Sequence, residues 1–208
     1  MKRILLIGLV IISLTFVLLF FLENKQQNTV VENNPVNQIK KSEKEKKKTY
    51  PIAEFEQRIT KKKFGDYITS ATSLVQPERF SGWHTGVDVE YDGNNEEIPV
   101  LAVCDGEIVL AKWVSGYGGT IVLKCQIENN DYYIIYGHLD TDSFIGKTEI
   151  TKGEKLAVLG NGFSQETDFE RKHLHFGIHK NSLDLRGYVQ NESELGEWVD
   201  PLTTELFN

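Results

Sequence analysis

The chain is poor in cysteine, which limits the kinds of site that it can build. It has two cysteines in 208 residues, and they do not have the C-x-x-C spacing of a metal-binding loop. We therefore assign no metal role to Cys104 and Cys125. Both lie in apolar, strand-like runs, where a disulfide formed outside the membrane and two buried thiols are equally ordinary. The sequence leaves both states open.

Positive charge is scarce in the larger, C-terminal part of the chain. Residues 64–208 carry 10 Lys and Arg against 24 Asp and Glu, a net charge of −14, which argues against nucleic acid as a partner. Residues 1–63 have the opposite balance, a net charge of +7. Their basic run "KKSEKEKKK", residues 40–48, offers a contact for anionic lipid or wall polymer, but we interpret it as a solvated tether.

Long helical periodicity is absent after residue 64. Short runs rich in Val, Ile, Tyr and Thr follow one another between glycine-containing turns, among them "PVLAVCDGEIVLAKWV", "GTIVLKCQI", "DYYIIYGHL", "EKLAVLGNG" and "HLHFGIHK". No internal repeat indicates a propeller or a solenoid. The sequence therefore predicts an all-β domain over residues 64–208, formed by a folded antiparallel sheet.

The one long apolar run lies at the N-terminus. Nineteen residues from Ile4 to Leu22 carry no charge, and a helix of that length reaches about 28 Å, close to the thickness of a bilayer core. The exit "LLFFLENK" lacks the small residues of a signal-peptide cleavage site. We expect an uncleaved transmembrane helix over residues 1–23, with Lys2 and Arg3 in the cytoplasm and the rest of the chain outside the cell membrane.

The segment between anchor and domain is polar. Residues 24–63 are predicted to form a basic tether, because a composition this poor in aromatic and aliphatic residues over 24–50 cannot bury enough surface to fold. Within it, residues 51–63 have Ile52, Phe55 and Ile59 at helical spacing, which predicts a short amphipathic helix.

Three of the five histidines fall in one seven-residue run, "HLHFGIH", residues 173–179. In a strand, side chains alternate between two faces, so His173, His175 and His179 share one face and the apolar side chains between them share the other. The bases of His173 and His175 would then be about 6–7 Å apart, close enough to serve one centre. Gly177 leaves room beside them.

A second cluster, "GWHTGVDVE", has the same design. In an extended chain His84, Gly86 and Asp88 share a face, while Thr85 and Val87 point the other way. Catalytic zinc sites take three nitrogen or oxygen ligands and leave a fourth position for water. His84, Asp88 and one histidine of the H-x-H pair supply that set. The other histidine, together with His138 of "YGHLD", would lie near the open position and handle protons.

The motifs "HTGVD", "YGHL" and "HLHF", in this order and with these intervals, resemble those of the lysostaphin-type (LytM-like) zinc peptidoglycan endopeptidases. The resemblance extends over most of residues 80–202 and includes the strands and turns between the motifs, as in "SGYGGTIVLK" and "ITKGEKLAVLGNG". It implies a folded antiparallel sheet with a long substrate groove, a Zn²⁺ cofactor, and the peptide part of the bacterial cell wall as substrate.

The resemblance also implies roles for individual residues. His84, Asp88 and His175 match the zinc ligands of the family. His138 and His173 match its two non-ligand histidines, which act on the water and the oxyanion. His179 matches no family position, and we expect it at the rim of the groove.

The chain departs from the family in three ways. The loop before H-x-H, "NGFSQETDFERK" at residues 161–172, is long and charged, and we expect it to form one wall of the groove. No tyrosine lies between Tyr67 and Tyr91, where family enzymes often have one before the first zinc-binding histidine, and whether Trp83 or another group replaces it stays open. No wall-binding domain is recognisable.

Two alternatives belong to other functional classes. The first is a non-enzymatic scaffold or activator with the same fold, acting on an unknown envelope protein; such relatives usually lack some ligands, and this chain lacks none. The second is a biotinyl or lipoyl carrier, suggested by "VLAVCDGEIV" and "KGEKLAVLG". It requires a lysine at a hairpin tip between the two runs, and the sequence has none in a suitable turn.

Overall fold

The computed structural model describes residues 48–204, and strands make up most of its regular structure. The predicted transmembrane helix over residues 1–23 and the tether up to residue 47 lie outside the described residues. Within residues 48–204, no helix is long and apolar enough to cross a membrane. The strands are β1 (Tyr67–Ile68), β2 (Gly82–His84), β3 (Gly86–Glu90), β4 (Pro99–Leu101), β5 (Gly106–Val114), β6 (Gly118–Ile127), β7 (Asn130–Leu139), β8 (Glu149–Ile150), β9 (Lys155–Val158), β10 (His173–Lys180) and β11 (Tyr188–Val189).

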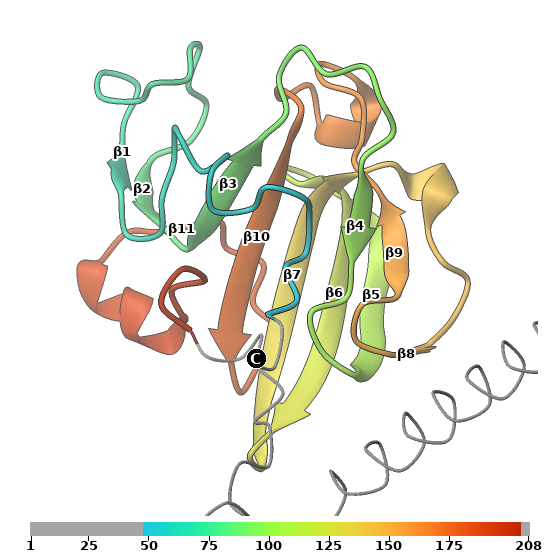
Figure 1. Ribbon diagram of the computed structural model, residues 1–208. Coiled ribbons are helices and arrows are strands. Elements are labelled where there is room, and N and C mark those ends of the chain that lie inside the picture. Colours follow the sequence, from blue (N-terminus) through green and yellow to red (C-terminus); the bar gives the residue numbers. More distant parts are fainter. Residues whose placement is uncertain (1–47, 205–208) are drawn as a thin grey trace, which may run out of the picture. The chain divides into compact units, whose positions relative to one another are not determined.

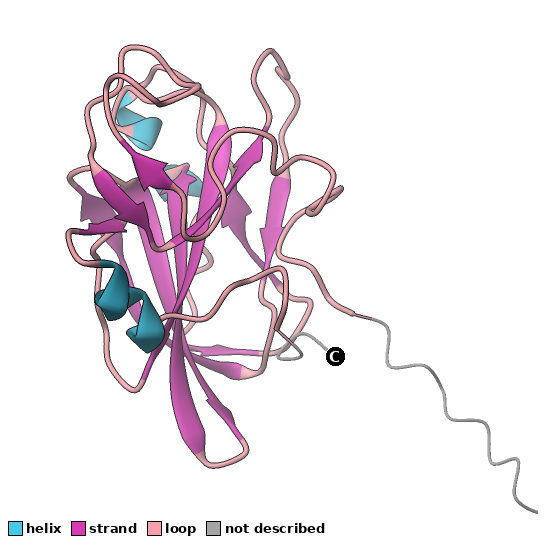
Figure 2. Cartoon of the chain, turned by 90° about the vertical axis from the view of Figure 1, so that its left-hand side faces the viewer, coloured by secondary structure: helices cyan, strands magenta, loops and turns pink. Residues whose placement is uncertain are grey.

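The strands form three antiparallel groups (Figure 1). A six-stranded sheet has the order β3-β10-β7-β6-β5-β8, a three-stranded sheet has the order β1-β2-β11, and β4 pairs with β9. Helical structure in the described residues is limited to three 3₁₀ segments, η1 (Thr141–Ser143), η2 (Gln165–Thr167) and η3 (Glu192–Glu197), as Figure 2 shows. The all-β, antiparallel fold predicted from the sequence is confirmed.

Strand β10, which lies between β3 and β7 in the six-stranded sheet, has one apolar face and one polar face. Its apolar residues Leu174, Phe176 and Ile178 are fully buried in the main core. That core also contains Val100 from β4 and Leu156 from β9, so the β4–β9 pair covers the apolar face of the sheet. The strict alternation of the sequence therefore places all the histidines of β10 on the opposite face.

The short helix predicted over residues 51–63 is not formed. This segment makes turns, and Ile52, Phe55 and Ile59 are buried in the main core. The Phe55 ring packs edge-on against Phe176 of β10, with 5.6 Å between ring centroids. The helical spacing of these apolar residues was misleading because contacts with the sheet, rather than local periodicity, decide the conformation of so short a segment.

A disulfide joins the ends of two strand regions. Cys104, just before β5, is bonded to Cys125 of β6, and their Cα atoms are 6.3 Å apart. The sequence left this pairing open, since a spacing of 21 residues does not by itself bring two cysteines together. An oxidised pair is typical of domains outside the cytoplasm.

Candidate metal centre

The pairing of β3 with β10 brings two distant motifs together. The two strands are antiparallel, with His175 opposite Asp88 and His173 opposite Glu90. Residues opposite each other on adjacent strands have side chains on the same face, so the Asp88 carboxylate and the His175 imidazole meet. The His175 Nδ1 atom lies 3.1 Å from Asp88 Oδ1.

His84 reaches the same point from a different sheet. The sequence predicts one extended segment through residues 84–88. In the structure the strand is interrupted at Thr85, which lies between the end of β2 and the start of β3. The Thr85 hydroxyl donates to the Arg186 carbonyl oxygen at 2.7 Å, and this bond fixes the crossing from the three-stranded to the six-stranded sheet. His84 therefore ends β2 and faces the first residues of the larger sheet, where it meets His175.

Three ligand atoms converge. His84 Nε2 is 3.2 Å from His175 Nδ1 and 3.4 Å from Asp88 Oδ1, which closes a triangle with the 3.1 Å contact described above. Tetrahedral zinc with bonds of about 2.0–2.1 Å separates its ligand atoms by about 3.3–3.4 Å. The three distances in the triangle are close to this separation, and all three residues are at most 5% exposed.

The outer contacts of His84 and Asp88 orient their lone pairs inward. His84 Nδ1 lies 3.1 Å from the Lys63 carbonyl oxygen, so this nitrogen carries the proton and Nε2 is the acceptor. The other oxygen of Asp88, Oδ2, accepts from Arg171 at 2.7 Å. Buried acceptor atoms this close to one another favour a cation between them, and the donor set of two imidazoles and one carboxylate suits zinc.

The charge of Asp88 is maintained inside the protein. Burial by itself raises the pKa of this carboxyl, but its interactions with His173, His84 and His175 together outweigh burial and hold the pKa well below its usual range. Arg171 in turn donates through Nε and Nη2 to Glu90, at 2.8 and 2.6 Å. An Asp88–Arg171–Glu90 chain therefore lies behind the ligand triangle, and sequence reasoning missed both Arg171 and Glu90.

His138 and His173, the two histidines predicted to transfer protons rather than to bind zinc, lie side by side. The ring centroids of His138 and His173 are 4.2 Å apart. His138 Nδ1 is 3.1 Å from the Thr167 carbonyl oxygen and His173 Nδ1 is 2.9 Å from that of Arg171, so both rings have an unprotonated Nε2. Burial lowers the pKa of His138 to about 3 and that of His173 well below its usual value. Both imidazoles are neutral at pH 7.

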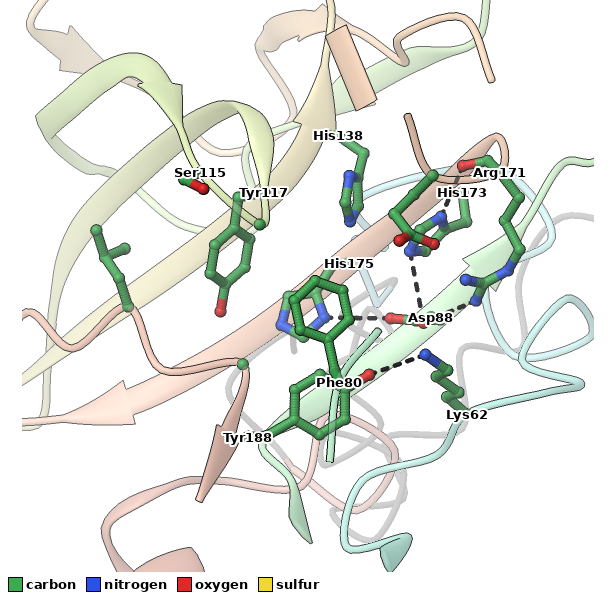
Figure 3. A pocket seen from close by; sticks show the side chains of 14 residues that line it. Lys62, Phe80, Asp88, Ser115, Tyr117, His138, Arg171, His173, His175 and Tyr188 are labelled. Atoms are coloured by element: carbon green, nitrogen blue, oxygen red, sulfur yellow. Dashed lines mark hydrogen bonds and ion pairs between the residues drawn. The ribbon is translucent and has the colours of Figure 1, made fainter. Parts of the chain in front are cut away.

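A cavity of about 140 Å³ lies against these groups (Figure 3). Asp88, His138, His173 and His175 line it, together with several side chains that the sequence did not point to: Lys62, Phe80, Tyr117, Arg171 and Tyr188. The loop over residues 161–172, expected to form a groove wall, lines it with its last residues, Glu170 and Arg171.

Two tyrosines supply phenols to the cavity. The Tyr188 ring is stacked between Phe80 and His84, at centroid distances of 5.5 and 5.1 Å, and its hydroxyl accepts from Lys62 Nζ at 3.0 Å. The Tyr117 hydroxyl is buried without a hydrogen-bond partner in the described part of the chain, and its ring packs edge-on against His175. Trp83, considered above for the absent loop tyrosine, instead packs on Tyr67. Phenols thus approach the site from the turn between β5 and β6 and from β11.

His179 was expected at the rim of the substrate groove, but it does not lie there. Its side chain is 3% exposed and its ring packs edge-on against Trp198, with 4.7 Å between centroids. The prediction was wrong because the chain after β11 folds back, so that residue 198 bridges to residue 179 and covers it. His179 does not line the cavity that His138, His173 and His175 line.

The model of Peptidase family M23 matches residues 82–186, which include all five predicted site residues. The chain belongs to this family. The resemblance to lysostaphin-type peptidases is thereby confirmed. M23 peptidases are zinc-dependent, and His84, Asp88 and His175 are a group that could hold a metal ion.

Two of the curated relatives are much longer than the region that they share with this chain. "Murein hydrolase activator NlpD" of Escherichia coli (strain K12) is 31% identical over 98 residues, which cover 47% of this chain and 23% of that protein. "Endolysin 2638A" of Staphylococcus phage 2638A is 27% identical over 129 residues, covering 61% of this chain and 24% of the endolysin. The chain therefore matches about a quarter of the length of these relatives.

Among solved structures, the catalytic domain of lysostaphin from Staphylococcus simulans is similar, with 24% identity and a TM-score of 0.48. The match covers 70% of this chain and 91% of that domain. The structure of LytU is similar at 23% identity, with a TM-score of 0.46, over 69% of this chain and 81% of that chain.

Proposed function

We propose that this M23 protein is a zinc endopeptidase that hydrolyses peptide bonds in bacterial peptidoglycan. The observation that carries the proposal is the convergence of three ligand atoms, from His84, Asp88 and His175, beside the neutral pair His138 and His173. Four of these five side chains line one cavity, which His84 does not line. Metal-assisted hydrolysis requires both kinds of group: ligands for the metal ion and side chains that transfer protons.

The ligands in this proposal are His84 through Nε2, Asp88 through Oδ1 and His175 through Nδ1. Zinc held by these three residues would supply Lewis-acid chemistry: it would lower the pKa of a water molecule towards about 7 and polarise a carbonyl oxygen. Arg171 keeps Asp88 Oδ2 occupied, so that this carboxylate offers one oxygen to the ion.

The remaining steps belong to side chains of this chain. The neutral Nε2 of His138 or His173 accepts a proton from the attacking water and, as imidazolium, donates it to the leaving amine or to the oxyanion. The Tyr188 hydroxyl already accepts from Lys62, which leaves its own proton free to donate to an oxyanion in the cavity. Water is consumed, and one carboxylate and one amine are formed.

The proposed location follows from the sequence. Residues 1–23 would anchor the chain in the cell membrane as a single span, with the catalytic part on the extracytoplasmic side near the wall. The Cys104–Cys125 disulfide supports an oxidising compartment. Because residues 51–63 pack on the domain, the proposed tether would end near residue 50, which shortens its reach.

A second candidate is a non-enzymatic activator of another wall hydrolase. It is favoured by the 31% identity to proteins named as murein hydrolase activators. The complete set of predicted ligands and proton-handling histidines favours the peptidase, because a scaffold has no need of a converging ligand triangle.

Purified sacculi distinguish the two. The full-length protein in mild detergent is incubated with zinc and sacculi, and new amino groups are counted for wild type and for His175→Ala. If the protein is a peptidase, the wild type releases amino groups without any other enzyme, and His175→Ala does not. An activator releases none alone, and promotes release by a separate wall hydrolase equally well with either form, which would refute the peptidase proposal.

A further inference from the structure

A second cavity, of about 480 Å³, adjoins the catalytic one. Glu170 and Arg171 line both cavities, so a ligand that extends from the catalytic cavity across these two residues enters the second. Its other walls come from the loop around residues 74–79 and from the loop over residues 161–172. Neither the family match nor the proposed reaction assigns it a role.

The second cavity exposes apolar side chains. Seven large apolar side chains are exposed in residues 48–204, and three of them line this cavity: Leu74 at 72%, Phe163 at 75% and Phe169 at 66%. Gathered exposed apolar side chains on a folded domain usually mark a contact site for a ligand.

The loops that carry these side chains are held in place. Phe163 and Phe169 have φ angles of 59° and 64°, a conformation that residues other than glycine adopt at a cost. Between them, the buried hydroxyl of Thr167 lies within hydrogen-bond distance of three carbonyl oxygens of its own loop. Arg79 joins the two loops through Glu170 at 2.7 Å and Asp168 at 3.2 Å. Two strained aromatic positions on a braced loop indicate a preformed surface.

The polar lining selects the chemical class of the ligand. The charges around the second cavity are paired: Lys61 with Asp92, Arg79 with Glu170, and Arg171 with Asp88 and Glu90. A charged ligand would therefore find no side chain of opposite charge that is not already in an ion pair. A wholly apolar ligand would strip water from these groups without replacing its hydrogen bonds. A neutral ligand with apolar faces and hydroxyl or amide edges satisfies both parts of the lining.

We infer that the second cavity is a subsite for the sugar rings of the glycan strand, with the apolar faces of N-acetylated pyranoses against Phe163 and Phe169. This inference rests on the proposed function, since the stem peptides of peptidoglycan are attached to such sugars. A glycan held there presents its own stem peptide to the catalytic cavity across Glu170 and Arg171. The enzyme would thereby prefer peptides that are still attached to the strand.

Binding is tested directly, without activity. The full-length protein in mild detergent is titrated with the tetramer of N-acetylglucosamine, and binding is followed by calorimetry. We expect saturable binding that weakens about tenfold or more in Phe163→Ala/Phe169→Ala, because two ring contacts are lost. Tyr67→Ala removes an aromatic ring that is 52% exposed but lines neither cavity, and it should leave binding within about twofold. Absence of binding by wild type, or equal binding by the double variant, overturns the subsite.

Cleavage separates this inference from the proposed function. With glycan-linked peptides, kcat/KM of the double variant should fall about tenfold through KM, while kcat/KM for the free peptide stays unchanged. An equal fall with both substrates shows that the cavity holds peptide, which overturns the subsite. If wild type binds the tetramer but cleaves neither substrate, the proposed function fails and the sugar subsite stands.

Discussion

Arg171 and Asp88 form a buried ion pair in which guanidinium Nη2 lies 2.7 Å from carboxylate Oδ2. The other oxygen of Asp88 faces His84 and His175. The same guanidinium also binds Glu90, and the side chains of Arg171 and Glu90 are 4% and 9% exposed. One cation thus compensates two buried carboxylates, and at the same time it determines which oxygen of Asp88 is available to a metal ion.

Removing this cation should destabilise the metal-free protein strongly. We predict that Arg171→Met lowers the free energy of unfolding by about 3–5 kcal/mol, since buried Asp88 loses its ion pair and buried Glu90 keeps only its pair with the partly exposed Lys61, at 3.3 Å. Arg171→Met/Glu90→Gln should lose less than Arg171→Met, because the buried charge of Glu90 is then absent. Arg186→Met removes a guanidinium with exposed ion pairs and should cost about 1 kcal/mol or less. Denaturant titration of zinc-free protein measures all three, and a loss below about 1 kcal/mol for Arg171→Met contradicts this account.

Two histidine substitutions on the same face of β10 should have different effects on the zinc content of the protein. His175 and His179 are both buried on β10, but only His175 belongs to the ligand triangle. We expect about one zinc per chain in wild type and in His179→Ala, and none retained by His175→Ala after dialysis, because two remaining ligands hold zinc weakly. Atomic absorption on samples shown to be folded by circular dichroism gives the answer. Equal zinc in the two variants would count against the assignment.

The two histidines without a ligand role should separate activity from metal binding. His138→Ala and His173→Ala are each expected to keep bound zinc and to lower kcat by about 10²–10⁴-fold, the usual contribution of a positioned proton-transfer group. The assay is amine release from sacculi at fixed zinc content. Loss of zinc from His173→Ala together with retention in His175→Ala would reverse the roles within the H-x-H pair.

The buried pair of Lys62 and Glu78 gives the fold a defined pH dependence. Burial raises the pKa of Glu78, but hydrogen bonds from Lys62 and Ser73 outweigh burial and place the pKa below its usual value. The pair's stabilisation is therefore complete above the unfolded pKa, about 4.3, and is lost as the pH falls through the lower folded value.

The difference in unfolding free energy between wild type and Glu78→Gln isolates this effect. It should be constant from pH 7 to about 5 and shrink below about pH 4. Glu149→Gln alters an exposed carboxyl group and serves as the control. A difference that grows on acidification would show that the sign assigned to Glu78 is wrong.

The sequence predicted the parts of the site that follow from local alternation. His173 and His175 on one face of a strand, with Leu174 and Phe176 on the other, require only the two-residue period of an extended chain. The break at Thr85 and the opposition of His175 to Asp88 depend on strand pairing across 87 residues, which no local pattern encodes. The residue pattern therefore suggested His84, Asp88 and one histidine of the H-x-H pair as ligands, and the family resemblance selected His175.

The missed residues reach the site through tertiary packing. Tyr188 stacks on His84 because β11 pairs with β2, and Lys62 enters the cavity because the preceding segment, around Phe55, packs on the core. Lysine and tyrosine at isolated positions carry no sequence signal of this kind. Because residues 24–63 were predicted to form a basic tether, Lys62 was not considered as a site residue, although its side chain is only 3% exposed.

The most direct test of the central claim is a crystal structure of the zinc-loaded protein with anomalous differences measured at the zinc edge. The account predicts one peak within about 2.0–2.2 Å of His84 Nε2, Asp88 Oδ1 and His175 Nδ1, with a solvent molecule in the fourth position and none of the other histidines in contact. A zinc ion bound through His138 or His173, or a fully protein-coordinated ion without an open position, would contradict it.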